Sequence, residues 1–221
     1  MAKKCLLALI LAAFITGSAF AMPDLNFSVG AGVYLTGDFG GGWEASGGGD
    51  SLTWKTPYFG GGGFIFFDAT FAELSLGFFG AGGNMTFEGR FGGQTISDRE
   101  RWSVGGFDIG LLGKYPVVMS DQLTLFPLLG LSYRVIFSAR MDGESICDPG
   151  DFSALWFKFG GGLDFAVNNR VFLRGQALYG FRVRNRFERD SVNDWGRYPG
   201  VNASARLGHG LSIRFGVGYR F

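Results

Sequence analysis

The 221-residue sequence has few of the residues that disulfide, metal and phosphate chemistry require. It contains two cysteines, one histidine and six prolines. Cys147 is the only cysteine after residue 21, so no internal disulfide is expected there; it is an incidental loop residue, an intermolecular partner or a metal ligand. One histidine and one cysteine cannot form a typical zinc site, and the glycine runs at 40–42 and 60–63 lack a phosphate loop's lysine and Ser/Thr. No cofactor is therefore expected.

Long apolar runs are also missing. No stretch after residue 21 reaches the roughly 18 uninterrupted apolar residues that a spanning helix needs. The 20 basic and 19 acidic residues nearly balance, so the charge gives no indication of a nucleic-acid partner. What is abundant is glycine, with 39 residues, and phenylalanine, with 25. This combination suits strands, because a glycine leaves room for a ring on the neighbouring strand.

The N-terminus has the pattern of an export signal. Lys3 and Lys4 precede an apolar run at 5–15, and Ala19 and Ala21 place small residues at both positions that a signal peptidase reads. The run is too short for a transmembrane anchor. Residues 1–21 are therefore predicted to be a cleaved signal peptide, and 22–221 the exported domain.

Period-two alternation of apolar and polar residues runs through this domain and predicts strands. The segment 155–167 is typical, since it sets Phe157 and Phe159 on one face against Lys158 and Asp164 on the other. The segment 58–67 is apolar on both faces, so its register stays open. The last strand is predicted to run unbroken through 208–210, because its apolar residues are all odd-numbered. Eight strands are predicted, at about 25–36, 58–67, 71–80, 104–115, 123–137, 155–167, 171–183 and 201–221.

The connections between these strands are sorted by length. Those around 68–70, 116–122 and 168–169 are short, whereas those at about 38–57, 82–101, 138–153 and 185–200 are long and polar. Transmembrane barrels have short turns on the periplasmic side and long loops outside the cell. The sequence therefore predicts an all-β fold, an eight-stranded antiparallel transmembrane β-barrel with both termini in the periplasm. A periplasmic β-sandwich, or a subunit of a larger assembly, is the alternative.

The polar face of such a barrel lines its lumen. A barrel of eight strands is only wide enough for side chains to fill it, so these residues predict a charge-paired plug, with the selectivity lining of a narrow pore as the alternative. Eleven residues are predicted to face the lumen: Glu73, Asp108, Lys114, Arg134, Lys158, Asp164, Arg174, Gln176, Arg182, Arg206 and Arg214.

The C-terminal residues 215–221, Phe-Gly-Val-Gly-Tyr-Arg-Phe, resemble the last strand of the small eight-stranded OmpA/OmpX/OmpW-type barrels of the bacterial outer membrane. The segments 123–130 and 158–182 resemble the fifth strand of those barrels and the hairpin that follows it. This resemblance implies an integral protein surrounded by outer-membrane lipid. It also implies that Tyr219 and Phe221 belong to the signal that the outer-membrane assembly machinery reads.

Catalysis is not predicted. Barrel enzymes that act on lipids need a serine nucleophile beside a histidine base. His209 is the only histidine, and Ser212, three residues further on, lies on the opposite face of its strand. The predicted role is structural, or one of surface interaction, with a host or surface ligand at the extracellular loops. A simply solvated loop is the alternative reading of 185–200, and a narrow porin-like channel for ions or small solutes is the alternative function.

Overall fold

The computed structural model of the protein describes residues 26–145, 148–183 and 185–221. The predicted signal peptide at 1–21 and Cys147 lie outside these residues. None of the helices within the described ranges combines the length and the apolar character needed to cross a membrane.

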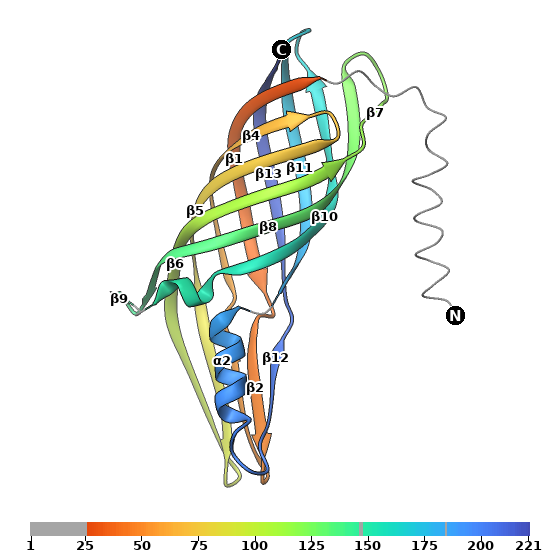
Figure 1. The fold of residues 1–221 in the computed structure, drawn as a ribbon. Coiled ribbons are helices and arrows are strands. Elements are labelled where there is room, and N and C mark those ends of the chain that lie inside the picture. The colour runs from red at the N-terminus through yellow and green to blue at the C-terminus, as the bar shows by residue number, and fades with distance from the viewer. Residues whose placement is uncertain (1–25, 146–147, 184) are drawn as a thin grey trace, which may run out of the picture.

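Eight long strands pair edge to edge in one closed antiparallel ring (Figure 1). The order is β1, β4, β5, β6, β8, β10, β11 and β13, and β13 pairs with β1 again, so no strand of the ring has a free edge along its central part. We call this arrangement the ring. Its strands are β1 (Phe27–Phe39), β4 (Tyr58–Ala69), β5 (Ala72–Phe91), β6 (Gln94–Lys114), β8 (Leu123–Met141), β10 (Ala154–Ala166), β11 (Val171–Arg182) and β13 (Gly208–Arg220).

Each ring strand coincides with one of the predicted strands. The open register of the second is settled: Phe64, Phe66 and Asp68 are buried inside, whereas Phe59 and Ile65 are exposed. Within the segment predicted as a short connection at 116–122, a two-residue strand, β7 (Val117–Val118), pairs with β8.

Four segments predicted as long loops are largely regular structure, which corrects the sequence prediction. The segment 38–57 contains β2 (Gly42–Gly47) and β3 (Asp50–Lys55), and 82–101 consists mainly of the prolonged ends of β5 and β6. Gly48, Gly49, Gly92 and Gly93 have positive φ values of 62°, 95°, 56° and 84°, which two-residue hairpin turns require. The apolar residues of β2 and β3 do alternate with polar ones, at Trp43 and Ala45 and at Leu52 and Trp54, but each of these strands has only two such positions, too few for periodicity to predict it.

The other two segments carry short elements. At 138–153 the chain forms β9 (Glu144–Ser145) and a 3-10 turn, η2 (Pro149–Phe152), and at 185–200 it forms the helix α2 (Arg186–Trp195). Asn185 caps α2, because its side chain accepts a hydrogen bond from the Glu188 backbone N–H at 2.8 Å while Glu188 reaches back to the Asn185 N–H. The segment 185–200, predicted as a long loop, thus contains a capped helix at 186–195.

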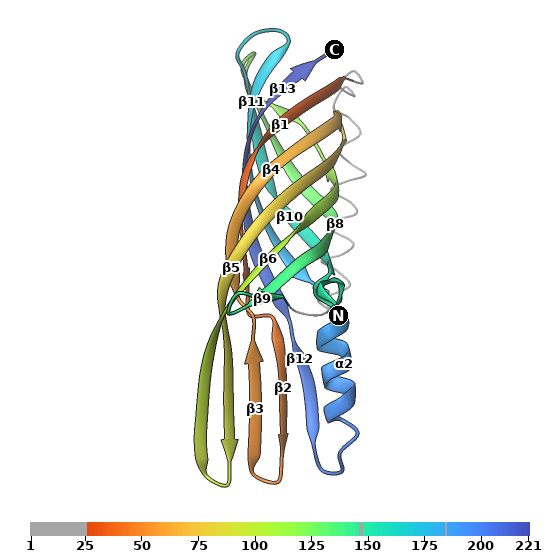
Figure 2. The ribbon, with the colours of Figure 1, turned by 90° about the vertical axis from the view of Figure 1, so that its left-hand side faces the viewer.

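Beyond the ring, a sheet in the order β12 (Asn202–Arg206), β2, β3 and β5, with β6 beside β5, projects away from the end of the ring at which β13 ends (Figure 2). We call this sheet, together with α2, the extension. Helix α2 packs on one of its faces, where Trp43, Ala45 and Leu52 are buried together with Val192 of the helix. The Trp43 and Trp195 rings lie 6.0 Å apart. The extension therefore has a small apolar core of its own.

The single eighth strand predicted at 201–221 is divided at Leu207 into β12 and β13. β12 pairs with β2, whereas β13 pairs with β1 and β11. Side-chain alternation changes face at this break, because Ala203 packs into the core beneath α2 while Leu211 points outward from the ring. Between β1 and β2, the strands that pair with β13 and β12, Gly40 has a φ of 75° and bends the backbone at the same level. The prediction that all odd-numbered residues share one face was therefore wrong.

Burial in the ring is inverted relative to a protein dissolved in water. Large apolar side chains point outward on every strand, and Phe78, Leu111 and Phe215 keep about 60% of their surface exposed, at 63%, 60% and 60%. The interior instead buries charged groups together with aromatic rings and some aliphatic side chains. Two of these rings lie directly over glycines on the paired strand, since a Cβ on Gly218 would fall 2.1 Å from the Phe172 ring. A Cβ on Gly30 would lie 2.3 Å from the Phe66 ring.

Candidate functional site

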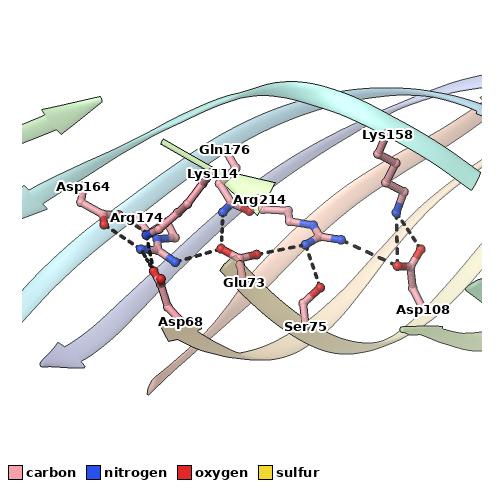
Figure 3. A network of polar contacts seen from close by, with 10 residues as sticks. All are labelled: Asp68, Glu73, Ser75, Asp108, Lys114, Lys158, Asp164, Arg174, Gln176 and Arg214. Carbon is pink, nitrogen blue, oxygen red and sulfur yellow. Dashed lines mark hydrogen bonds and ion pairs between the residues drawn. The ribbon is translucent and has the colours of Figure 1, made fainter. Parts of the chain in front are cut away.

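The strongest chemical feature of the described residues is a network of charged side chains inside the ring (Figure 3). Ten of the eleven residues predicted to face the lumen lie within it. Arg206 does not: it stands on β12, its side chain is 41% exposed, and its nearest anionic partner is Glu44 at 4.0 Å. The placement of Arg206 in the lumen is corrected, because the break at Leu207 turns that side chain to the outer face of the extension.

Arg174 is the hub of the half of the network nearest the chain termini. Its Nε and Nη2 donate to the two oxygens of Asp164 at 2.7 and 2.6 Å, Nη1 donates to Glu73 Oε2 at 2.8 Å, and Nη2 also donates to Asp68 Oδ2 at 2.5 Å. Phe66 lies on one side of the guanidinium, with its centroid 4.6 Å from Cζ. Bidentate pairing and flanking rings hold a guanidinium in one orientation. Two further donors complete the cluster, since Lys114 bonds to Asp68 and Gln176 Nε2 donates to Glu73 at 2.6 Å.

Asp108 is the corresponding hub of the other half. Lys158 Nζ lies 3.2 and 3.0 Å from its two oxygens, and Arg134 Nη2 donates to Oδ2 at 3.3 Å. Arg134 in turn donates to the hydroxyl groups of Tyr58 and Thr36 at 2.6 and 3.2 Å.

Arg214 joins the two halves. Its Nη1 lies 3.6 Å from Glu73 Oε1 and its Nη2 3.7 Å from Asp108 Oδ1, while Nη1 also donates to Ser75 at 3.2 Å. The network is therefore continuous along the ring.

A third cluster connects the ring to the helix of the extension. Arg182 Nη1 donates to Asp38 Oδ2 at 3.0 Å, and its Nη2 donates to Glu188 of α2. All three side chains are buried. Burial raises the pKa of the Glu188 carboxyl above its ordinary value, against the opposing effect of Arg182. Through this cluster the N-terminal turn of α2 is held against the mouth of the ring.

The charges of this network balance. An unpaired charge in such an interior would cost several kcal/mol, so equal numbers of each sign are what a stable interior needs. Six cationic and six anionic side chains take part, all nearly excluded from solvent: Lys114, Arg134, Lys158, Arg174, Arg182 and Arg214 against Asp38, Asp68, Glu73, Asp108, Asp164 and Glu188.

Little space remains inside the ring. The cavity beside Arg134 and Lys158 measures about 10 Å³, which is at the lower limit for a single water molecule. A larger cavity of about 200 Å³ opens at the end near the chain termini, where Asp68, Lys114 and Asp164 line it. The arrangement can hold the strands in register, but it leaves no room for a solute beside Arg134.

Sequence reasoning missed three of the six carboxylates. Asp38 would have been placed correctly by prolonging the first strand two residues beyond Thr36, since even-numbered residues of β1 point inward. Asp68 was missed because the register of its strand was open. The sequence does contain the Asn185-x-x-Glu188 pattern of a capping box, which signals a helix start, but the pairing of Glu188 with Arg182 forms only when that helix packs against the ring.

His209 and Ser212 lie on opposite faces of β13, as their spacing predicted. Ser212 is buried in the interior, whereas His209 is partly exposed and its Nδ1 lies 2.9 Å from the Tyr179 hydroxyl. The described residues contain no group of three His, Cys, Asp or Glu side chains placed to hold a metal ion.

No protein-family model and no curated protein sequence matches the chain. Solved structures that it resembles are bacterial outer-membrane proteins. They include outer membrane protein OprG from Pseudomonas aeruginosa, with 13% identity, 89% of this chain and 96% of that chain covered, and a TM-score of 0.47. Neisserial surface protein A has 12% identity, coverage of 87% and 99%, and a TM-score of 0.46. The outer membrane protease OmpT from Escherichia coli has 12% identity, coverage of 90% and 98%, and a TM-score of 0.35.

The solved structures named above are, like the barrels that the C-terminal sequence resembles, proteins of the bacterial outer membrane. The proteins matched differ in what they do, one being a protease, and the likeness is distant. It therefore carries no inference about the activity of this chain.

Proposed function

We propose that this protein is an integral outer-membrane protein whose ring spans the bilayer, with a closed interior and with the extension as its interaction surface outside the cell. The single observation that carries the proposal is the inverted burial of the ring. Phe78, Leu111 and Phe215 expose apolar surface that would be costly in water, while Asp108 and Arg174 are buried. Lipid reverses that cost, and a closed ring leaves no unpaired backbone edge within the hydrocarbon.

The direction of insertion follows from the two ends of the ring. At one end the chain termini meet tight turns such as Asn168–Asn169, where the Asn168 side chain accepts the Arg170 N–H at 2.9 Å. At the other end stand the extension and α2 (Figure 2). Short turns face the periplasm in transmembrane barrels, so both termini lie there in the proposed orientation. Tyr219 and Phe221, whose rings are 5.7 Å apart, then end the strand that the assembly machinery reads.

Insertion is tested by expressing the chain in a Gram-negative host. We expect it in the outer-membrane fraction and, when unheated, to migrate on a gel differently from a boiled sample. For orientation, Cys147→Ser is combined with either Ser97→Cys, in the extension, or Asp121→Cys, in a turn at the opposite end; both sites are exposed. A membrane-impermeant maleimide should label Ser97→Cys on intact cells and Asp121→Cys only after lysis. The reverse pattern would show that the orientation is wrong.

A closed interior is proposed in preference to a channel because the paired charges fill the cross-section. The refolded protein in a planar bilayer should give no resolved conductance steps. The unmodified protein is compared with Lys158→Ala, because this substitution enlarges the cavity of about 10 Å³ and leaves the extension unchanged. Steps in the unmodified protein would overturn the closed interior and favour the channel.

The proposal assigns no catalytic role. A serine nucleophile needs a histidine base within hydrogen-bond reach, and Ser212 and His209 point to opposite sides of β13. His209→Ala should therefore leave insertion and the mobility shift unchanged. Loss of either on this substitution would point to a function for His209 that the geometry does not supply.

A further inference from the structure

A hollow of about 400 Å³ lies on the outer surface, where β5, β6 and β8 pass from the ring toward the extension. Its floor has little side-chain volume, because Gly82 and Ser103 are paired across β5 and β6. Two arginines stand at its sides: Arg140 is paired in register with Ser103, and Arg101 with Asn84. Three adjacent strands therefore bring two guanidinium groups to one depression.

These two arginines are not neutralised by their neighbours. Both are exposed, and within the described part of the chain neither guanidinium has a hydrogen-bond or ion-pair partner. The carboxylate of Asp142 accepts the backbone N–H of Arg101 at 3.0 Å, and no hydrogen bond or ion pair joins it to either guanidinium. The cations of a second surface hollow differ in this respect, since Lys55 lies 3.1 Å from Glu88 and Arg206 lies 4.0 Å from Glu44.

On the ring side the hollow adjoins the outward-facing apolar side chains of the ring, which we call the apolar belt. Phe78 and Phe107 are paired across β5 and β6, and the Phe107 and Phe137 rings lie 5.2 Å apart. Gly80 and Gly105 form the row between these rings and the hollow, and a Cβ on Gly80 would meet no atom within 4 Å. The rings stand four residues from the row of Arg140, about 13 Å along the strands.

We propose that this hollow binds the phosphorylated headgroup of a membrane lipid, with Arg101 and Arg140 contacting the phosphate. The bare strip at Gly80 and Gly105 then receives the first part of an acyl chain, which continues over Phe107. The inference rests on the proposed function, because it needs the belt to be in the bilayer. A guanidinium fork matches phosphate oxygens, and the junction of an apolar belt with a polar extension is the depth at which lipid phosphates lie. A soluble phosphate would leave the strip and the rings unused.

The test compares lipids retained by the purified full-length protein in nanodiscs. The discs contain phosphatidylcholine with or without phosphatidic acid, whose headgroup is an unsubstituted phosphate, and retained lipids are counted by native mass spectrometry. Wild type should retain phosphatidic acid preferentially, and Arg101→Gln/Arg140→Gln should weaken that preference about tenfold. Gly82→Leu, which fills the hollow but leaves both charges, should weaken it as well. Arg206→Gln removes one positive charge at the other hollow and should leave it unchanged.

The possible outcomes distinguish a failure of this inference from a failure of the proposed function. Equal retention by wild type and the double variant, or an equal loss in Arg206→Gln, would overturn the site. Displacement of the lipid by millimolar glycerol 3-phosphate would show a site for soluble phosphates and overturn the lipid assignment. Insertion is scored separately, by flotation with phosphatidylcholine vesicles and by the gel mobility shift. A chain that inserts without lipid preference overturns only this inference, whereas one that does not insert overturns the proposed function too.

Discussion

Arg174 offers the sharpest test of the charged interior. Replacing it with methionine keeps an unbranched apolar stem but removes all four of its hydrogen bonds to carboxylates. Asp164 then has no ion-pair partner among the described residues, and Asp68 keeps only Lys114. Removing one partner of a buried pair typically costs about 3–5 kcal/mol, because a charge remains without compensation. We expect Arg174→Met to lower the free energy of unfolding by this amount.

Two other variants show how large this loss of unfolding free energy is by comparison. Lys158→Met leaves Asp108 with Arg134 at 3.3 Å and Arg214 at 3.7 Å, so its effect should be smaller than that of Arg174→Met. Arg206→Gln affects only an exposed pair at 4.0 Å and should cost less than about 0.5 kcal/mol.

The assay is equilibrium unfolding in urea of the protein folded in detergent micelles, with the folded fraction read from the mobility of unheated samples on a gel. With slopes of about 1–3 kcal/mol per molar urea, the Arg174→Met midpoint should fall by roughly 1–5 M. If Arg206→Gln destabilised the protein as much as Arg174→Met, the structural division between interior and surface charges would be refuted.

Three further predictions follow from single contacts. Gly218→Val should destabilise the ring by about 1–3 kcal/mol in the same unfolding assay, because its Cβ would overlap the Phe172 ring; an unchanged midpoint would contradict this packing. Trp43→Ala should expose α2 to protease while the mobility shift of the ring persists, and loss of both would mean that the extension and ring are one cooperative unit. Because the pKa of Glu188 is raised in the folded protein, protonation of its carboxyl stabilises the fold. This contribution to stability is fully present below the ordinary glutamate pKa and is lost as the pH rises through the folded pKa. Hydrogen-exchange protection of α2, corrected for intrinsic rates, should therefore increase from about pH 8 to about pH 5 in wild type but not in Glu188→Gln, and an equal trend in both would refute it.

The central part of every ring strand, and the inward or outward direction of most of their side chains, could be predicted from the sequence. Strand geometry has a period of two, so the alternation in 155–167 specifies that Lys158 and Asp164 share a face even before any partner strand is known. The abundance of glycine and phenylalanine likewise anticipated rings lying over glycines, as Phe172 lies over Gly218. The direction of a side chain along a strand is a local property, so the local pattern of residues predicts it.

Features that depend on contacts between distant segments became known only from the tertiary structure. Periodicity did not predict the extension, because each of its short strands has only two alternating apolar residues and its core beneath α2 combines stretches of chain that are far apart in the sequence. The break at Leu207 moved Arg206 out of the lumen, since a shift of one residue exchanges the two faces of a strand. Pairing of Glu188 with Arg182, and the approach of Arg101 to Arg140 across β6 and β8, likewise need the strands in register. A period of two gives the direction of each side chain, but which charge meets which is fixed only when the ring closes.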